Sequence, residues 1–247
     1  MKALVLEEYN KLVFKEMPTP QIEDNEVLIE VKACGICGSD VHGMDGSSGR
    51  RHPPLIMGHE AAGVIVERGA LVSEFSEGDR VTFDSTIYCS ECFYCRQGLI
   101  NLCDNRRVLG VSPPEYRQHG AFAQFVAVPE HILYRLPEKL SYVQAAMVEP
   151  VSIAFHAISL TPISLNDSVV VIGSGMVGIF VIQALRAAGC GTIIAVDLEQ
   201  DKLDLALQLG ADYGLLADKV DGVKEVRELT DGRGAPIAVE VVGNTAA

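Results

Sequence analysis

Positive charge is scarce in this 247-residue sequence, which has 20 Lys and Arg residues against 33 Asp and Glu residues and a formal net charge of −13. Binding to nucleic acid or to an anionic membrane surface needs a basic patch, so we expect neither partner. Hydrophobic residues make up 48% of the chain and charged residues 21%, which is typical of an ordinary globular protein.

We expect neither an export signal nor a membrane span in this sequence. Its first six residues run directly into Glu7 and Glu8 without a long apolar core, so we expect no signal peptide. The most apolar stretch, residues 169–185, is interrupted by three glycines and is better explained as a strand, a turn and a helix. We therefore expect a cytoplasmic location, with the cysteines as free thiols or metal ligands rather than disulfides.

Internal repeats and low-complexity segments are absent, but the pattern changes after Pro137. Before it, short alternating or apolar runs are separated by Gly, Pro, Asp and Ser, which predicts a small antiparallel barrel-like or sandwich-like fold. The clearest of these expected strands are 26–31, 62–67, 79–83 and 122–129.

After Pro137, helices and strands alternate, which predicts a doubly wound parallel sheet. We expect helices over 141–147, 149–160, 176–188, 200–209 and 220–229, and strands over 168–172, 192–196, 213–216 and 237–242. A dinucleotide-binding sheet usually has six strands and only four are found here, so we expect the chain to be a fragment of a longer enzyme.

Four cysteines have the spacing C-x2-C-x2-C-x7-C, namely Cys89, Cys92, Cys95 and Cys103. Four thiolates can close a tetrahedral shell around Zn²⁺ and leave no open position, so this site is predicted to be structural. An iron–sulfur cluster is the alternative, because thiolates also suit iron.

A second metal site is suggested by residues that are scattered along the chain. The stretch ACGICGSDVH contains Cys34 and Cys37, whose spacing alone would allow a redox pair or half of a zinc knuckle. A catalytic zinc needs three protein ligands and an exchangeable position. One thiolate, one imidazole and one carboxylate would suffice, and we expect Cys37 and His59 with either Glu60 or Glu149.

The motif GSGMVG, residues 173–178, follows an expected buried strand and opens an expected helix, which is typical of dinucleotide binding. The expected cofactor contacts are Gly173, Gly175, Met176, Val177 and Gly178. Asp197 ends the next strand and should accept hydrogen bonds from the adenosine ribose, favouring NAD over NADP. Capping of the helix that begins near Gln200 is the alternative role for Asp197.

Five motifs now stand in a fixed order: GICGSDVH at 35–42, GHE at 58–60, GDRV at 78–81, the four cysteines, and EP at 149–150. In this order they resemble the zinc-dependent medium-chain alcohol dehydrogenases, and specifically their sorbitol (polyol) dehydrogenase branch. The resemblance implies a GroES-like β-barrel catalytic domain over 1–145. It also implies a Rossmann NAD-binding domain over 146–247, with about four of its six strands.

The resemblance also implies roles at the catalytic zinc. Cys37, His59 and Glu149 match the family's three ligands, and Glu60 matches an acidic residue behind the metal that can exchange into the ligand shell. Which glutamate is the third ligand at rest stays open. Asp40 matches a carboxylate that orients the imidazole of His59, with a plain turn residue as its alternative.

Proton transfer and ribose binding are implied in the same way. Ser39 matches a hydroxyl that hydrogen-bonds the substrate alcohol, and His42 matches a histidine that relays the proton to solvent. An uninvolved surface histidine is the alternative for His42. Lys202 matches a family position that reaches the adenosine ribose.

The implied activity is NAD-dependent oxidation of a secondary alcohol on a polyol or sugar alcohol to the ketone, with one catalytic and one structural Zn²⁺. Threonine 3-dehydrogenase-like and sugar-alcohol-phosphate dehydrogenase activities are close alternatives, because related branches share nearly every motif. An inactive protein that binds zinc and NAD is the alternative of another class. The resemblance implies a dimer or tetramer for the full-length protein.

Overall fold

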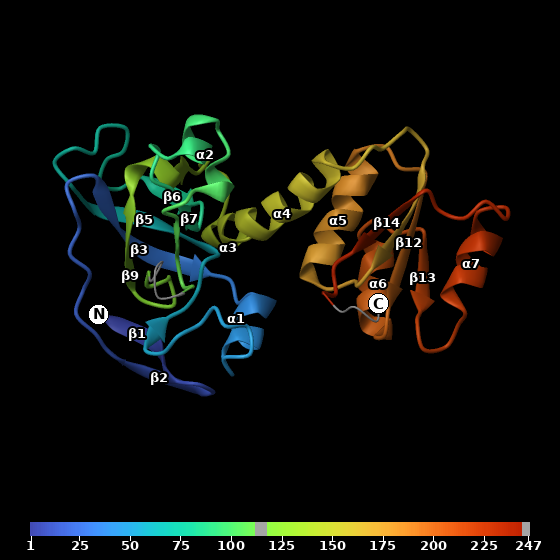
Figure 1. Ribbon diagram of the computed structural model, residues 1–247, viewed down its shortest axis with the longest axis horizontal. Coiled ribbons are helices and arrows are strands. Elements are labelled where there is room, and N and C mark those ends of the chain that lie inside the picture. Colours follow the sequence, from blue (N-terminus) through green and yellow to red (C-terminus); the bar gives the residue numbers. More distant parts are fainter. Residues whose placement is uncertain (112–117, 244–247) are drawn as a thin grey trace. The chain divides into compact units, whose positions relative to one another are not determined.

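The computed structural model describes residues 1–111 and 118–243. The chain divides into two compact units, Met1–Glu149 and Pro150–Ala247 (Figure 1). Within the described residues, no helix combines the length and the apolar character needed to cross a bilayer.

The first unit is built from antiparallel strands. Its strands are β1 (Lys2–Glu8), β2 (Lys11–Glu16), β3 (Glu26–Cys34), β4 (Leu55–Ile56), β5 (Ala61–Arg68), β6 (Arg80–Phe83), β7 (Thr86–Ile87), β8 (Arg107–Val108), β9 (Phe125–Pro129) and β10 (Leu133–Arg135). They form a five-stranded sheet in the order β10-β6-β5-β3-β9, a three-stranded sheet β2-β1-β4, and the pair β7-β8. Short helices connect them: α1 (Gly38–Gly43), α2 (Phe93–Arg96) and α3 (Tyr142–Ala146), with 3-10 turns η1 (Ile100–Leu102) and η3 (Glu130–Ile132).

Strand β3 lies between β5 and β9 in the five-stranded sheet and contributes to the core of this unit. Val27 and Ile29 on β3 are fully buried and belong to one cluster with Ile65, Val81 and Val128 from neighbouring strands. Burial of β-branched side chains across adjacent strands is the main force that holds such a sheet together.

The register of β3 against β5 decides what lies at one end of this sheet. Cys34, the last residue of β3, is paired with Ala61, the first residue of β5. The next backbone hydrogen bond runs from the Gly35 amide to the Glu60 carbonyl, at 2.7 Å. The segment that follows β3 and the segment that precedes β5 are therefore brought side by side.

The second unit is a parallel sheet covered by helices on both faces. Its strands are β11 (Ser168–Ile172), β12 (Thr192–Asp197), β13 (Tyr213–Leu216) and β14 (Ile237–Glu240), in the order β13-β12-β11-β14. Its helices are α5 (Met176–Ala187), α6 (Gln200–Gln208) and α7 (Gly222–Leu229), and helix α4 (Val148–Ser159) contains the boundary between the units.

Alternate residues of the buried strand β11 point to opposite faces of this sheet. Val169 and Val171 pack with Ile182 of α5 and Leu203 of α6. Val170 belongs to a separate cluster that includes Val226 and Leu229 of α7. Because both faces are covered, the strand is apolar throughout, which is why the run of valines predicts a buried parallel strand.

The predicted succession of an antiparallel β region and a doubly wound parallel sheet is confirmed. The predicted boundary between residues 145 and 146 lies within α3, whereas the compact units divide between Glu149 and Pro150, inside α4.

Candidate metal and dinucleotide sites

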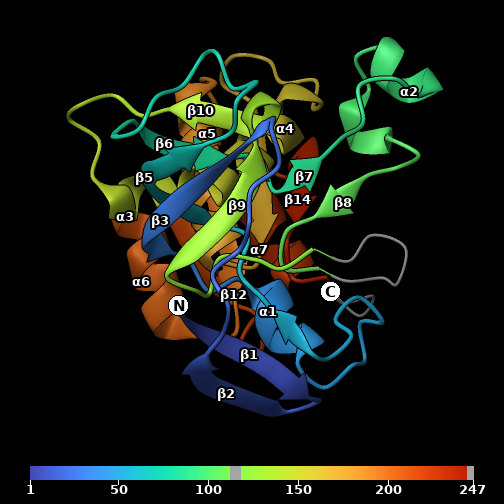
Figure 2. The same ribbon diagram turned by 90° about the vertical axis from the view of Figure 1, so that its left-hand side faces the viewer.

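The four-cysteine lobe, residues 89–103, projects away from the five-stranded sheet (Figure 2). The ligand atoms of Cys89, Cys92, Cys95 and Cys103 all lie within 4.8 Å of one another. The structure therefore brings together all four predicted ligands. Four sulfurs this close to one another can surround a tetrahedral Zn²⁺.

Backbone and side-chain donors already point at these sulfurs. The Cys89 amide donates to the Cys103 sulfur at 3.3 Å, and the Asn105 side-chain amide donates to the Cys89 sulfur at 3.7 Å. Hydrogen bonds from the backbone amides of Glu91 and Cys92 lower the pKa of Cys89 to about 6. These bonds favour the thiolate of Cys89, the form that binds a metal, whereas burial and the neighbouring cysteines raise the pKa of Cys95.

A second group of potential ligands lies where β3 and β5 are paired. Cys37, at the N-terminus of α1, and His59 and Glu60, just before β5, place one ligand atom each within 4.8 Å of one another. His59 and Glu60 are buried, and Glu60 Oε1 has no hydrogen-bond partner among the described residues. A buried carboxylate oxygen without a donor is costly unless a cation satisfies it, so this group fits a metal ion.

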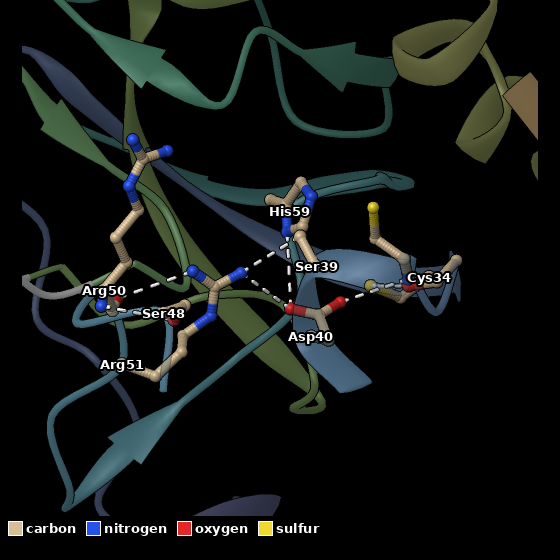
Figure 3. A network of polar contacts seen from close by, with 9 residues as sticks. Cys34, Ser39, Asp40, Ser48, Arg50, Arg51 and His59 are labelled. Atoms are coloured by element: carbon tan, nitrogen blue, oxygen red, sulfur yellow. Dashed lines mark hydrogen bonds and ion pairs between the residues drawn. The ribbon is translucent and has the colours of Figure 1, made fainter. Parts of the chain in front are cut away.

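Asp40 connects two members of this group (Figure 3). Its Oδ2 accepts a hydrogen bond from the Cys37 amide at 3.2 Å, and its Oδ1 lies 3.6 Å from His59 Nδ1. Because Nδ1 faces Asp40, the other ring nitrogen of His59 is available to a metal. The side chain of Asp40 is only 2% exposed, so its charge acts on His59 with little screening by water.

The electrostatics of this pocket favour a cation. Burial alone would lower the pKa of His59, but Asp40 and Cys37 beside it raise the pKa to about 10. Burial raises the pKa of Glu60. The pKa of Asp40 is also pushed upward by burial, but His59 and Arg51 hold it below its usual range. Several acidic groups gathered out of water are the expected surroundings of a bound metal ion.

Glu149 stands apart from the three-ligand group. It is half-buried, and burial raises its pKa while the charge of His59 opposes that rise. The interaction with His59 places it in the same electrostatic environment, but the set of ligand atoms within 4.8 Å contains Cys37, His59 and Glu60. Of the two predicted third ligands, the geometry brings Glu60 to the other two residues.

Ser39 and His42 lie on α1, one turn apart, and both are exposed. Residues at this spacing are neighbours on one side of a helix, which a proton path between them requires. Ser39 Oγ accepts a hydrogen bond from Arg51 Nη2 at 3.2 Å. A hydroxyl has one hydrogen to donate, so this bond leaves the Ser39 proton free for another partner.

The glycine-rich turn in the second unit joins β11 to α5. Gly173 has φ +98°, and a Cβ on Gly178 would stand 2.0 Å from the Gly173 carbonyl oxygen, so a side chain at either position would disrupt the turn. Gly175 caps α5 without a side-chain hydrogen bond, which leaves first-turn N–H groups available for an anion.

A cavity of about 940 Å³ opens beside this turn. Of the predicted cofactor residues, Gly173, Gly175, Asp197 and Lys202 line it, whereas Met176, Val177 and Gly178 do not. The cavity lies at the carboxyl ends of the parallel strands where the strand order reverses, which is where doubly wound sheets bind their ligands.

Asp197 is held in place by three backbone amides. Its Oδ2 accepts from the Ser174 amide at 2.7 Å, and its Oδ1 accepts from Leu198 at 2.8 Å and Glu199 at 3.1 Å. Helix α6 is capped by Glu199 without a side-chain bond, so capping of that helix is not the role of Asp197. Lys202 forms an ion pair with Glu199 at 2.8 Å.

Two residues near the metal group were missed by the sequence interpretation. Arg51 is 3% exposed, and its guanidinium contacts Asp40 and Ser39. Gly35 packs so closely that a Cβ there would stand 2.3 Å from Glu60 Oε2. The spacing of the sequence motifs gives no signal for Arg51. The signal for Gly35 was its place as the first residue of the GICGSDVH motif, to which no role for this glycine was assigned.

Comparisons with known proteins agree with this geometry. Residues 23–138 match the model of the alcohol dehydrogenase GroES-like domain, and residues 176–247 match that of the zinc-binding dehydrogenases. The chain therefore belongs to the zinc-binding alcohol dehydrogenase family, oxidoreductases that use zinc and a nicotinamide dinucleotide.

Individual relatives span the whole chain. A sorbitol dehydrogenase of Bacillus subtilis is 36% identical over 250 residues, which cover 100% of this chain and 70% of that protein. A D-arabitol-phosphate dehydrogenase of Enterococcus avium is 36% identical over 238 residues, covering 95% and 66%. The crystal structure of a zinc-binding dehydrogenase of Sinorhizobium meliloti 1021 with NADP superposes with a TM-score of 0.91 at 31% identity, covering 99% and 70%.

Proposed function

We propose that the chain oxidises a secondary alcohol on a polyol or sugar alcohol to the ketone, with zinc and NAD. The observation that carries this proposal is the group of Cys37, His59 and Glu60, whose three different ligand types lie within 4.8 Å of one another. Three protein ligands with one position left for substrate are typical of catalytic zinc. The similarity to a sorbitol dehydrogenase supports a polyol as the substrate.

Cys37, His59 and Glu60 would hold the catalytic zinc, with Glu149 as a second carboxylate in the same environment. The four cysteines of the lobe would hold a structural zinc. When bound, the catalytic zinc supplies Lewis acidity that lowers the pKa of the alcohol, and the dinucleotide supplies the hydride acceptor. The residues of the chain supply orientation and the path for the proton.

Asp40 would orient the ring of His59 through its charge, because its Oδ1 faces Nδ1 from 3.6 Å. Ser39 Oγ would accept the proton of the substrate hydroxyl and pass on its own. His42, exposed one turn further along α1, would deliver that proton to solvent. His42→Ala should therefore slow hydride transfer near neutral pH, and an unchanged rate would remove His42 from the pathway.

The choice of dinucleotide would rest on Asp197. Its carboxylate lines the cavity next to the glycine-rich turn and is fixed by three amides. A negative charge in this position can accept hydrogen bonds from ribose hydroxyls and repels a 2′-phosphate, so NAD is favoured. Lys202 would reach the same ribose after leaving Glu199.

Oxidation of a phosphorylated sugar alcohol is the second candidate. It is favoured by the D-arabitol-phosphate dehydrogenase, which is as similar to this chain as the sorbitol dehydrogenase, at 36% identity. A phosphate group on the substrate would need cationic partners that an unphosphorylated polyol does not need.

The test is NADH formation by the purified chain with polyols, sugar-alcohol phosphates and L-threonine, alongside its zinc content. Turnover of polyols that is lost in Cys37→Ala supports the proposal. Turnover restricted to phosphorylated substrates supports the second candidate. Two zinc ions per chain without turnover of any substrate would mean that the chain binds its cofactors and is inactive.

We further propose that the protein is a cytoplasmic homo-oligomer, a dimer or a tetramer. Analytical ultracentrifugation of the protein at several concentrations would measure its state of association.

A further inference from the structure

Arg51 is a buried cation in the first unit. Among the charged side chains that the structure describes as buried, the others are acidic or histidine, and Arg51 itself is 3% exposed. Moving a guanidinium out of water costs several kcal/mol unless an opposite charge and good hydrogen bonds compensate. Because burying the guanidinium costs this much free energy, we infer that Arg51 is kept in place by its interactions with the residues around it.

The neighbours of Arg51 are the residues around the proposed catalytic zinc (Figure 3). Nη2 donates to Asp40 Oδ1 and to Ser39 Oγ, both at 3.2 Å, and Nη1 donates to the Arg50 carbonyl at 3.5 Å. The same Oδ1 faces His59 Nδ1. One carboxylate oxygen is therefore shared between a permanent cation and the imidazole of a proposed ligand.

The chain makes room for this arrangement at Gly43, the last residue of α1. A Cβ on Gly43 would stand 2.5 Å from Arg51 Cγ, so any side chain there would displace the stem of the arginine. Gly43 has no positive φ that would require glycine for backbone reasons. Its small size is explained by the passage of Arg51 over α1.

We propose that Arg51 is a positioning residue of the zinc site. Its guanidinium holds the Asp40 carboxylate against His59. Because it also donates to Ser39 Oγ, the hydroxyl hydrogen of Ser39 points away from the guanidinium. This inference rests on the proposed zinc site at Cys37, His59 and Glu60. It adds a residue that acts on the metal only through Asp40 and Ser39.

The experiment measures the release of zinc from the full chain to an excess of chelator. The four-cysteine lobe provides an internal reference, since its metal belongs to the same molecule and does not touch Arg51. Cys37→Ala first identifies which release phase belongs to the catalytic site. If the wild-type chain has no phase that Cys37→Ala removes, then the zinc site itself is refuted, and the role of Arg51 with it.

The test variants are Arg51→Met, which removes the charge, Arg51→Lys, which keeps it, and Gly43→Ala, which displaces the stem. We expect Arg51→Met to release the catalytic zinc about 10- to 100-fold faster and to leave the lobe phase unchanged. Arg51→Lys should recover part of this loss. Gly43→Ala, with all charges retained, should fall between wild type and Arg51→Met.

Arg50→Met is the matched control, because Arg50 is exposed and its guanidinium points away from Asp40 (Figure 3). It should release both metals at the wild-type rates. Equal acceleration of both phases in Arg51→Met would show general loss of structure and would overturn the proposal. Unchanged release of the catalytic zinc in Arg51→Met would overturn it as well.

Discussion

Replacement of Asp40 by Asn should destabilise the first unit strongly, even without metal. The change leaves the guanidinium of Arg51 buried without its counter-charge, and the two side chains are only 3% and 2% exposed. Removing one partner of a buried ion pair costs about 3–5 kcal/mol. At about 2–4 °C per kcal/mol for a unit of this size, the midpoint of thermal unfolding should fall by roughly 6–20 °C.

The assay is calorimetry of the metal-free chain, in which the transition of the second unit serves as an internal reference. A double variant with Asp40→Asn and Arg51→Met, compared with the two single variants, separates the interaction energy of the pair from the other contacts of each residue. Replacing both partners by groups of similar shape should cost much less than the sum of the single changes. If the double variant loses as much as the two single variants added together, then the pair contributes nothing and the reasoning is refuted.

Three further predictions concern the metal and dinucleotide sites. Gly35→Ala should displace the carboxylate of Glu60, whose Oε2 would lie 2.3 Å from the new methyl group, and zinc content should fall by one ion per chain while the lobe stays loaded. Cys37→Ala should lose the same ion, whereas Cys34→Ala should lose none, because Cys34 packs against the core of the first unit; metal analysis of both variants checks this. Asp197→Asn should favour NADPH, so the dissociation constant for NADPH divided by that for NADH should fall on the order of 10-fold. Titration with each dinucleotide measures this ratio, and an unchanged ratio would contradict the assignment.

Features that depend on local spacing could be predicted from the sequence. The four cysteines of the lobe are close in the chain, so a single loop is enough to bring their sulfurs together. The glycine-rich turn is local in the same sense, because a buried strand, a tight turn and a helix follow one another without interruption. Alternation of apolar residues predicted β3, and a continuous run of valines predicted β11.

Features that depend on register could not be predicted in the same way. The meeting of Cys37 with His59 and Glu60 follows from the pairing of Cys34 with Ala61, and a shift of one residue would send every side chain to the other face. From the residues alone either Glu60 or Glu149 could be the third ligand, and the resemblance matched Glu149 to the ligand and Glu60 to the residue that can exchange with it.

Arg51 was beyond sequence reasoning for a different reason. It follows Arg50 directly in a run of small and polar residues, and two adjacent arginines in such a segment look alike. Arg50 is exposed, whereas Arg51 is buried because its stem packs against Gly43, where there is no side chain, and its guanidinium pairs with Asp40. Such a pairing of distant residues leaves no periodic pattern in the sequence.

The four-cysteine lobe has a consequence for the order in which the chain acquires its structure. Helix α2 buries none of its residues, and Phe93, Leu99 and Leu102 expose 69%, 43% and 45% of their surface. The lobe therefore has almost no apolar interior of its own, and a metal bound by its four cysteines would take the place of one. With the structural zinc that we propose, the five-stranded sheet would assemble without metal, whereas the lobe would become ordered only when zinc binds. Scarcity of zinc in the cell would then first become visible in this loop, as a site open to proteases on an otherwise folded unit.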